Sequence, residues 1–150
     1  MIALVQRVTR AEVEVDGAQV ASIGPGLLIL LGVAVGDGQA QAEYLAAKIS
    51  AMRIFDNAEG NFDLSIKDVA GQALVVSQFT LMGSWRKGRR PGFEKAASPQ
   101  QAAPLVDAFA YELEKQGIDL KRGVFGAHMM VSLVNDGPVT FCLDTEQKEQ

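Results

Sequence analysis

The sequence is poor in the residues that build most metal centres and catalytic triads. It contains one cysteine and one histidine among 150 residues. An internal disulfide needs two cysteines, and a closed zinc site needs about four cysteine or histidine ligands, so both are excluded. Neither a P-loop nor a dinucleotide-binding glycine motif is present. We therefore expect no metal and no cofactor.

Long apolar runs and excess positive charge are also lacking. The longest apolar stretch, residues 27–35, is shorter than the roughly 20 residues that a membrane-spanning helix needs. The first residues lack the apolar core and cleavage site of a signal peptide. The net charge is −4, which excludes a protein that wraps nucleic acid with its whole surface. We expect a cytoplasmic protein that does not enter a membrane.

What is present is typical of one globular domain. Hydrophobic residues make up 48% and charged residues 21% of the chain, so extensive disorder is excluded. No repeat or linker divides the sequence. We expect a single domain over residues 1–150, in which the polar tail 145–150 is frayed.

The hydrophobic patterns predict many strands and two helices. Strands are expected at residues 2–9, 11–16, 18–23, 27–33, 73–80, 118–124, 128–134 and 139–143. Residues 27–33 have no polar face, which indicates a central strand covered on both sides. A helix capped by Asp37 is expected over residues 39–52, and another should begin at Ser98-Pro99 and end near Gly117. Pro104 is expected to kink the second helix or to shift its start. The fold class predicted is α/β, with curved or paired sheets and helices on one face.

The two residues most often used as base or nucleophile do not point to a site. His128 is the one candidate base for a triad, and we interpret it as a surface or packing residue. Cys142 lies in an apolar segment, so we expect it to be buried in the core. If the protein is an enzyme, its chemistry depends on hydroxyls, backbone dipoles and groups of the substrate. Hydrolysis of an activated ester is a reaction of that kind.

Three segments carry the polar groups that remain. The first, at a strand end, is Ser77-Gln78-Phe79-Thr80, which could hold an oxyanion or simply face water. The second is Asn135-Asp136-Gly137-Pro138-Val139-Thr140, a turn in which a cis bond before Pro138 would align neighbouring carbonyl groups. The third is Arg86-Lys87-Gly88-Arg89-Arg90, beside Trp85 and Phe93, which is either a solvated loop or a contact for phosphates.

These three segments together resemble the signature blocks of the D-aminoacyl-tRNA deacylase family. The opening residues 5–11 and the segment 24–28 are similar to the family as well, and the resemblance covers residues 1–144. One segment, residues 81–85, departs from it, because relatives often carry Tyr-Ala-Asp-Thr there. The resemblance implies a homodimer with a three-layer α/β fold, in which two β-sheets form a barrel-like arrangement with helices on one face. It also implies hydrolysis of the ester of D-aminoacyl-tRNA, and of glycine mischarged on tRNA.

The resemblance also implies roles for individual residues. A cis bond between Gly137 and Pro138 would enter the active site of the other subunit, where main-chain oxygens bind the substrate amino group and exclude an L side chain. Asn135, Val139 and Thr140 belong to the same substrate-binding block. Ser77, Gln78, Phe79 and Thr80 would form the catalytic block. Either Thr80 is the nucleophile, or water attacks with help from the ribose 2′-hydroxyl while the backbone at Phe79 and Thr80 stabilises the oxyanion. The tRNA would be bound by Arg86, Lys87, Arg89 and Arg90.

Two other readings of the residues remain open. A non-catalytic RNA-binding module would use the basic run alone, and its affinity would fall steeply with salt. A small-metabolite binder would use the Gly-Pro segment only to close a pocket, and it would have no salt-sensitive affinity for RNA.

Overall fold

A computed structural model describes residues 1–146 as an α/β fold with one large sheet, one small sheet and two α-helices. The strands are β1 (Ile2–Val15), β2 (Ala18–Ile23), β3 (Gly26–Gly32), β4 (Phe55–Asp56), β5 (Phe62–Leu64), β6 (Gln72–Ser77), β7 (Asp119–Arg122) and β8 (Met130–Asp144). The helices are α1 (Gln39–Ala51), the short 3-10 helix η1 (Phe79–Met82) and α2 (Pro99–Lys115). The large sheet has the order β2-β1-β3-β6-β7, with β8 on the other edge of β1, and β4 pairs with β5 in the small sheet.

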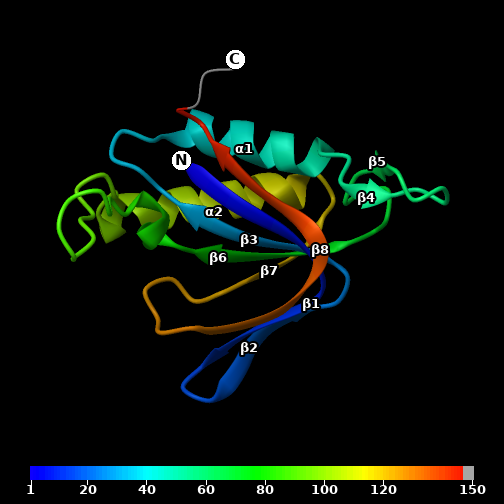
Figure 1. The fold of residues 1–150 in the computed structure, drawn as a ribbon, viewed down its shortest axis with the longest axis horizontal. Helices are drawn as coiled ribbons and strands as arrows, with labels where there is room; N and C mark the ends of the chain where they lie inside the picture. The colour runs from blue at the N-terminus through cyan, green and yellow to red at the C-terminus, as the bar shows by residue number, and fades with distance from the viewer. Residues whose placement is uncertain (147–150) are drawn as a thin grey trace.

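The three-layer arrangement is confirmed, and the alternation of side chains in β3 explains it. Leu27, Ile29 and Leu31 face α1 and α2, and they form one core with side chains of both helices. Leu28 faces the other way, into a second core with residues of β1, β2 and β6. Both helices lie on one side of the sheet, while the ends of β1 and β8 curve away with β2 (Figure 1). The curved sheet therefore supplies two of the layers and the helices supply the third.

Strand β1 is one long strand, so the prediction of separate strands at residues 2–9 and 11–16 is wrong. Its first half pairs with β3, from Ile2 opposite Gly32 to Val8 opposite Gly26. Its second half pairs with β2, while β8 follows the other edge along most of its length. This double pairing carries the strand through the polar residues at positions 9 and 10, where the sequence suggested a break.

The helix ends follow the sequence except at Asp37. Gly38 is the N-cap of α1, and its N–H group donates to Gln41 Oε1. The Asp37 carboxylate instead accepts from the N–H of Ala34 at 2.7 Å and contacts the Met1 amino group at 2.9 Å. It therefore fixes the loop before the helix rather than the helix itself.

Helix α2 begins and ends as the sequence predicts. Ser98 is its N-cap and Pro99 its first residue. Gly117, at φ +83°, ends it in the left-handed conformation that glycine adopts without strain. Pro104 neither shifts the start nor ends the helix, because the carbonyl left without its bond belongs to Gln100, an exposed residue whose surroundings are open to water.

Other differences concern chain ends and surfaces. The β4–β5 hairpin was not predicted, because its strands are two and three residues long. Cys142 is exposed on β8, so its predicted burial is wrong. Thr145 is held rather than frayed, since its N–H donates to the Met1 carbonyl at 3.0 Å, and positions 147–150 of the predicted tail lie outside the described residues. Within residues 1–146 no helix is long and apolar enough to cross a membrane.

Candidate functional site

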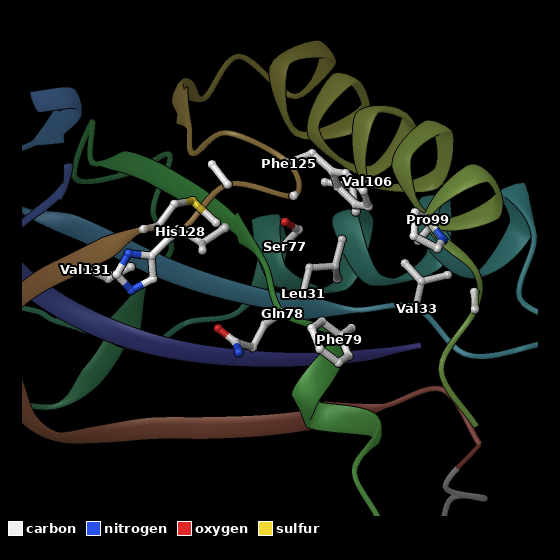
Figure 2. Close-up of a pocket in the computed structure, with 16 residues that line it drawn as sticks. Leu31, Val33, Ser77, Gln78, Phe79, Pro99, Val106, Phe125, His128 and Val131 are labelled. Atoms are coloured by element: carbon white, nitrogen blue, oxygen red, sulfur yellow. The ribbon is translucent and has the colours of Figure 1, made fainter. Parts of the chain in front are cut away.

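A hollow of about 520 Å³ opens where β6 ends, between the sheet and α2. Ser77, Gln78 and Phe79 lie along one side of it, and Phe125, His128 and Met129 lie along another. Figure 2 shows the Ser77 hydroxyl directed into the hollow below Phe125 and Val106, with the Phe79 ring nearby and the His128 ring at one side. Most of the lining is apolar, so the few polar groups are set against a surface that favours a flat or apolar ligand.

The chain leaves the sheet just after Ser77, so the prediction that the strand continues to Thr80 is wrong. Gln78 N–H donates to the Leu31 carbonyl at 2.7 Å, and the next residues turn into η1. The physical reason is tertiary packing, since η1 lies directly over the end of β3. A Cβ atom on Gly32 would be 2.9 Å from the Gln78 carbonyl oxygen and 2.9 Å from Met82 Cε. Phenylalanine and threonine favour strands locally, and this packing overrides that preference.

The catalytic block contains hydroxyl, amide and main-chain groups. The Gln78 side-chain amide donates to Thr80 Oγ1. An amide cannot remove a proton at neutral pH, so this contact does not activate the Thr80 hydroxyl as a nucleophile. The first hydrogen bond within η1 runs from Leu81 N–H to the Gln78 carbonyl. The N–H groups of Phe79 and Thr80 come before this bond, so they have no partner within the helix.

His128 is exposed at the edge of the hollow, as the surface interpretation expected. In Figure 2 its ring lies to the left of the Gln78 side chain, on the segment that leads into β8. No hydrogen bond joins His128 to a side chain of the catalytic block in the part of the chain that the structure describes. No group of three histidine, cysteine, aspartate or glutamate residues among positions 1–146 is placed to hold a metal ion.

The second block is a bulge within β8, so the prediction of two strands joined by a turn is wrong. Gln6 pairs with Thr140 and Val8 pairs with Asn135, so residues 136–139 of β8 lie opposite the single residue Arg7. The Gly137–Pro138 peptide bond is cis, and both residues are exposed. The Asn135 side-chain amide donates to the carbonyl groups of Arg7 at 2.9 Å and Val139 at 3.1 Å, which ties the two ends of the bulge together.

Arg7 is the residue beside the second block that the sequence reasoning missed. It is 6% exposed and lies behind the bulge. Its Nη1 atom donates to the Ile54 carbonyl at 2.9 Å and is 3.3 Å from Asp56, while Nε is 3.0 Å from Asp136. The Nε–Asp136 contact is a charge pairing, because the N–H is not aligned for a hydrogen bond. An arginine at an apolar-facing strand position was the available signal, since such a charge is seldom buried without partners.

The two blocks do not meet within one chain. None of residues 135–140 lines the hollow beside Ser77. The bulge lies in β8, on the edge of β1 opposite β3, whereas the catalytic block lies beyond β3, at the end of β6.

The basic run does lie next to the catalytic block. Ser84 and Gly92 exchange two backbone hydrogen bonds of 2.8 and 2.9 Å, which close a loop that displays Arg86, Lys87, Arg89 and Arg90. All four are exposed, and none makes an ion pair with another residue among positions 1–146. At the base of the loop, the Phe93 ring packs edge-on against Phe79 with 5.1 Å between centroids.

The fold and this site define an α/β protein with a half-open apolar hollow edged by hydroxyl, amide and main-chain groups. Known proteins resemble this chain in sequence and in fold. Residues 4–144 match the profile of the family described as D-Tyr-tRNA(Tyr) deacylase, and the chain belongs to this family.

Several relatives and solved structures match this chain over nearly its whole length. The D-aminoacyl-tRNA deacylase of Roseiflexus castenholzii is 57% identical over 145 residues, which cover 97% of this chain and 92% of that one. The D-aminoacyl-tRNA deacylase of Porphyromonas gingivalis is 53% identical over 150 residues, covering 99% and 100%. A solved structure described as a c-Myc DNA unwinding element binding protein is 40% identical, with a TM-score of 0.91 over 98% of this chain and 100% of that chain. A probable eukaryotic D-amino acid tRNA deacylase shares the fold at 16% identity, with a TM-score of 0.81 over 95% and 97%.

Proposed function

We propose that this protein hydrolyses the ester that joins a D-amino acid to the terminal ribose of tRNA, and that it acts in the cytoplasm as a homodimer. The observation that carries the proposal is the family match over residues 4–144. The reaction suits the site, because an aminoacyl ester is already activated. Oriented dipoles and a bound water then lower the barrier without a strong base.

The hollow beside Ser77 is the proposed place of the reaction. Its apolar walls suit the flat terminal base of the tRNA, and the Ser77 and Gln78 side chains offer hydrogen bonds at its edge. We assign the oxyanion to the main-chain N–H groups of Phe79 and Thr80. Water is the nucleophile and the ribose 2′-hydroxyl assists it, because the hydroxyl of Thr80 contacts an amide rather than a base.

Selection for D-amino acids is assigned to the exposed bulge at Gly137 and Pro138. Main-chain oxygens there would accept hydrogen bonds from the α-amino group of the substrate, and an L side chain would collide with the same backbone. A D side chain would point away, so its size would matter little. Glycine has no side chain to collide, and we therefore expect glycyl-tRNA to be hydrolysed as well.

The proposed dimer is supported by an edge that a single chain leaves open. Strand β8 pairs only with β1 among the described strands, so its other edge is free along fifteen residues. Met130, Leu133, Val134 and Phe141 are exposed on this strand. A long unpaired apolar edge promotes association, and a second copy of the chain is the partner that closes it symmetrically. Such a dimer can bring the bulge of one subunit to the hollow of the other.

Incubation of the purified protein with D-tyrosyl-tRNA and L-tyrosyl-tRNA tests the proposed function. We expect rapid loss of the D ester and survival of the L ester, measured as the amino acid retained on tRNA. Equal loss of both, or loss of neither, would contradict the proposal. Salt-sensitive tRNA binding without hydrolysis would identify an RNA-binding module instead.

A further inference from the structure

An exposed tryptophan stands beside the proposed catalytic block. Trp85 is 75% exposed, the most exposed of the large hydrophobic side chains among residues 1–146. It lies three residues after the end of η1, and it is the first residue inside the loop that the Ser84–Gly92 hydrogen bonds close. The segment after η1 projects from one end of the molecule, drawn in green in Figure 1. A large apolar side chain held in water at this place offers its ring face to a ligand.

The loop holds this ring in a defined position. The two hydrogen bonds between Ser84 and Gly92 fix the backbone on either side of the loop, and Gly88 turns its tip at φ +73°. The Arg86 guanidinium carbon lies 5.4 Å from the centroid of the Trp85 ring. A cation stacked near an aromatic face, next to further positive charges, is an arrangement that binds unpaired bases and the phosphates between them.

A second hollow, of about 510 Å³, begins at this ring. It runs along Leu81 and Met82 of η1, and Arg86 and Lys95 contribute positive charge to its lining. The carboxylates of Glu94, Asp144 and Glu146 line it too, so its interior does not favour a phosphate. A neutral base would not be repelled by these carboxylates, whereas backbone phosphates would follow the exposed cations of residues 86–90.

We propose that Trp85 is a stacking platform for an unpaired base near the 3′ end of tRNA, and that Arg86 covers one face of the ring while the base stacks on the other. The proposal rests on the proposed function, because the catalytic block that η1 carries would hold the terminal nucleotide. Trp85 lies five residues beyond Thr80 and three residues after the last residue of this short helix. The platform therefore receives one of the unpaired nucleotides that precede the terminal one, and it guides the ester toward the hollow.

The chain offers a direct readout, since Trp85 is its single tryptophan. We expect uncharged tRNA to quench the intrinsic fluorescence of Trp85 in a saturable way. The same tRNA without the unpaired nucleotides at its 3′ end should bind through charge alone and cause little quenching. Equal quenching by both RNAs, or quenching by neither, would overturn the platform.

Substitutions separate stacking from charge. Stacking of one base on an aromatic ring is worth about a 5- to 100-fold change in affinity, so Trp85→Ala should weaken tRNA binding by that factor and leave its salt dependence unchanged. Trp85→Phe should restore most of the affinity. The matched variant Arg89→Ala should instead reduce the slope of log K against log salt by about 0.7 to 0.9. Unchanged affinity in Trp85→Ala would overturn the proposal, and the exposure of the ring ensures that this variant folds.

These experiments test the stacking platform and the proposed function independently of each other. If intact tRNA quenches the fluorescence of Trp85 but the protein leaves D-aminoacyl-tRNA uncleaved, the proposed function fails and the platform stands. If it cleaves D-aminoacyl-tRNA while Trp85→Ala binds tRNA as tightly as the parent, the platform fails and the proposed function stands.

Discussion

At the scale of single residues, Thr80 distinguishes two ways of breaking the ester. Its hydroxyl accepts a hydrogen bond from the Gln78 amide, and no base contacts it among the described residues. A hydroxyl without a base is a poor nucleophile at neutral pH. The structure therefore favours the water mechanism over the threonine nucleophile, both of which the sequence left open.

The variant Thr80→Ala tests this point. We expect it to keep at least about a tenth of the parental rate, because the main-chain N–H groups remain in place and the lost hydroxyl contributes at most about one neutral hydrogen bond. Single-turnover hydrolysis of D-tyrosyl-tRNA measures the rate. A loss of a thousandfold or more in a folded variant would identify Thr80 as the nucleophile.

Arg7 lies behind the proposed site. Its guanidinium joins the Ile54 carbonyl and Asp56 to Asp136, which lies beside Gly137 in the bulge. Replacement by methionine keeps the buried apolar stem but leaves the carbonyl without a partner. We expect Arg7→Met to lower the free energy of unfolding by about 1–3 kcal/mol, measured in urea, and to reduce the preference for D over L substrates.

Arg10→Met on the same strand is the matched control, because Arg10 is exposed. It should change neither the free energy of unfolding nor the preference for D over L substrates measurably. If Arg7→Met destabilises the protein but keeps the full D preference, Arg7 supports the fold only and has no part in selection. The sequence places an arginine at an apolar-facing strand position but does not reveal its partners, because Ile54 and Asp56 come from one distant part of the chain and Asp136 from another.

At the scale of elements, the contact between β3 and η1 positions the catalytic block. Gly32 ends β3 directly against Gln78 and Met82, with no space for a Cβ atom. We expect Gly32→Ala to displace η1, to cost about 1–3 kcal/mol of stability and to lower kcat/KM for D-tyrosyl-tRNA. Urea unfolding and steady-state hydrolysis measure the two effects.

Gly24→Ala provides the comparison for this variant. A Cβ atom there would meet Gln72 Oε1 at 3.6 Å, which is an ordinary contact. Its effect on both stability and kcat/KM should be small. Equal effects of the two substitutions would show that loss of glycine itself, rather than the collision with η1, is responsible.

The elements that the sequence predicted well are those whose signals are local. Ser98-Pro99 and Gly117 delimit α2 by their own chemistry, and the fully apolar residues 27–33 indicate a buried strand without further information. The bulge at residues 136–139 and the turn into η1 depend instead on partners in β1 and β3. In the bulge, glycine and proline locally indicate a turn, and at the start of η1 strand-forming residues locally indicate a strand. Tertiary packing overrides both local signals.

At the scale of the whole molecule, the proposed site is divided between two regions of the chain. The hollow lies at the end of β6, and the bulge lies on the far side of β1 next to the free edge of β8. A dimer that closes this edge would join them. We expect Phe141→Glu, on the exposed edge strand, to yield a folded monomer without deacylase activity, as measured by light scattering and hydrolysis.

Val20→Glu is the control, since Val20 is also an exposed apolar residue but lies on β2. This variant should remain dimeric and active. An active monomer of Phe141→Glu would contradict the shared site, whatever the oligomeric state of the parent protein.

The most direct test of the central claim, that the bulge of one subunit completes the hollow of the other, is a mixed dimer. One chain carries Ala127→Trp, which fills the hollow, and the other carries Pro138→Ala, which alters the bulge. Each variant alone should lack D-selective hydrolysis. Their mixture should regain it, because one of the two sites in a mixed dimer combines an open hollow with an intact bulge. A mixture of folded dimers that regains no activity would show that the two blocks do not act across subunits.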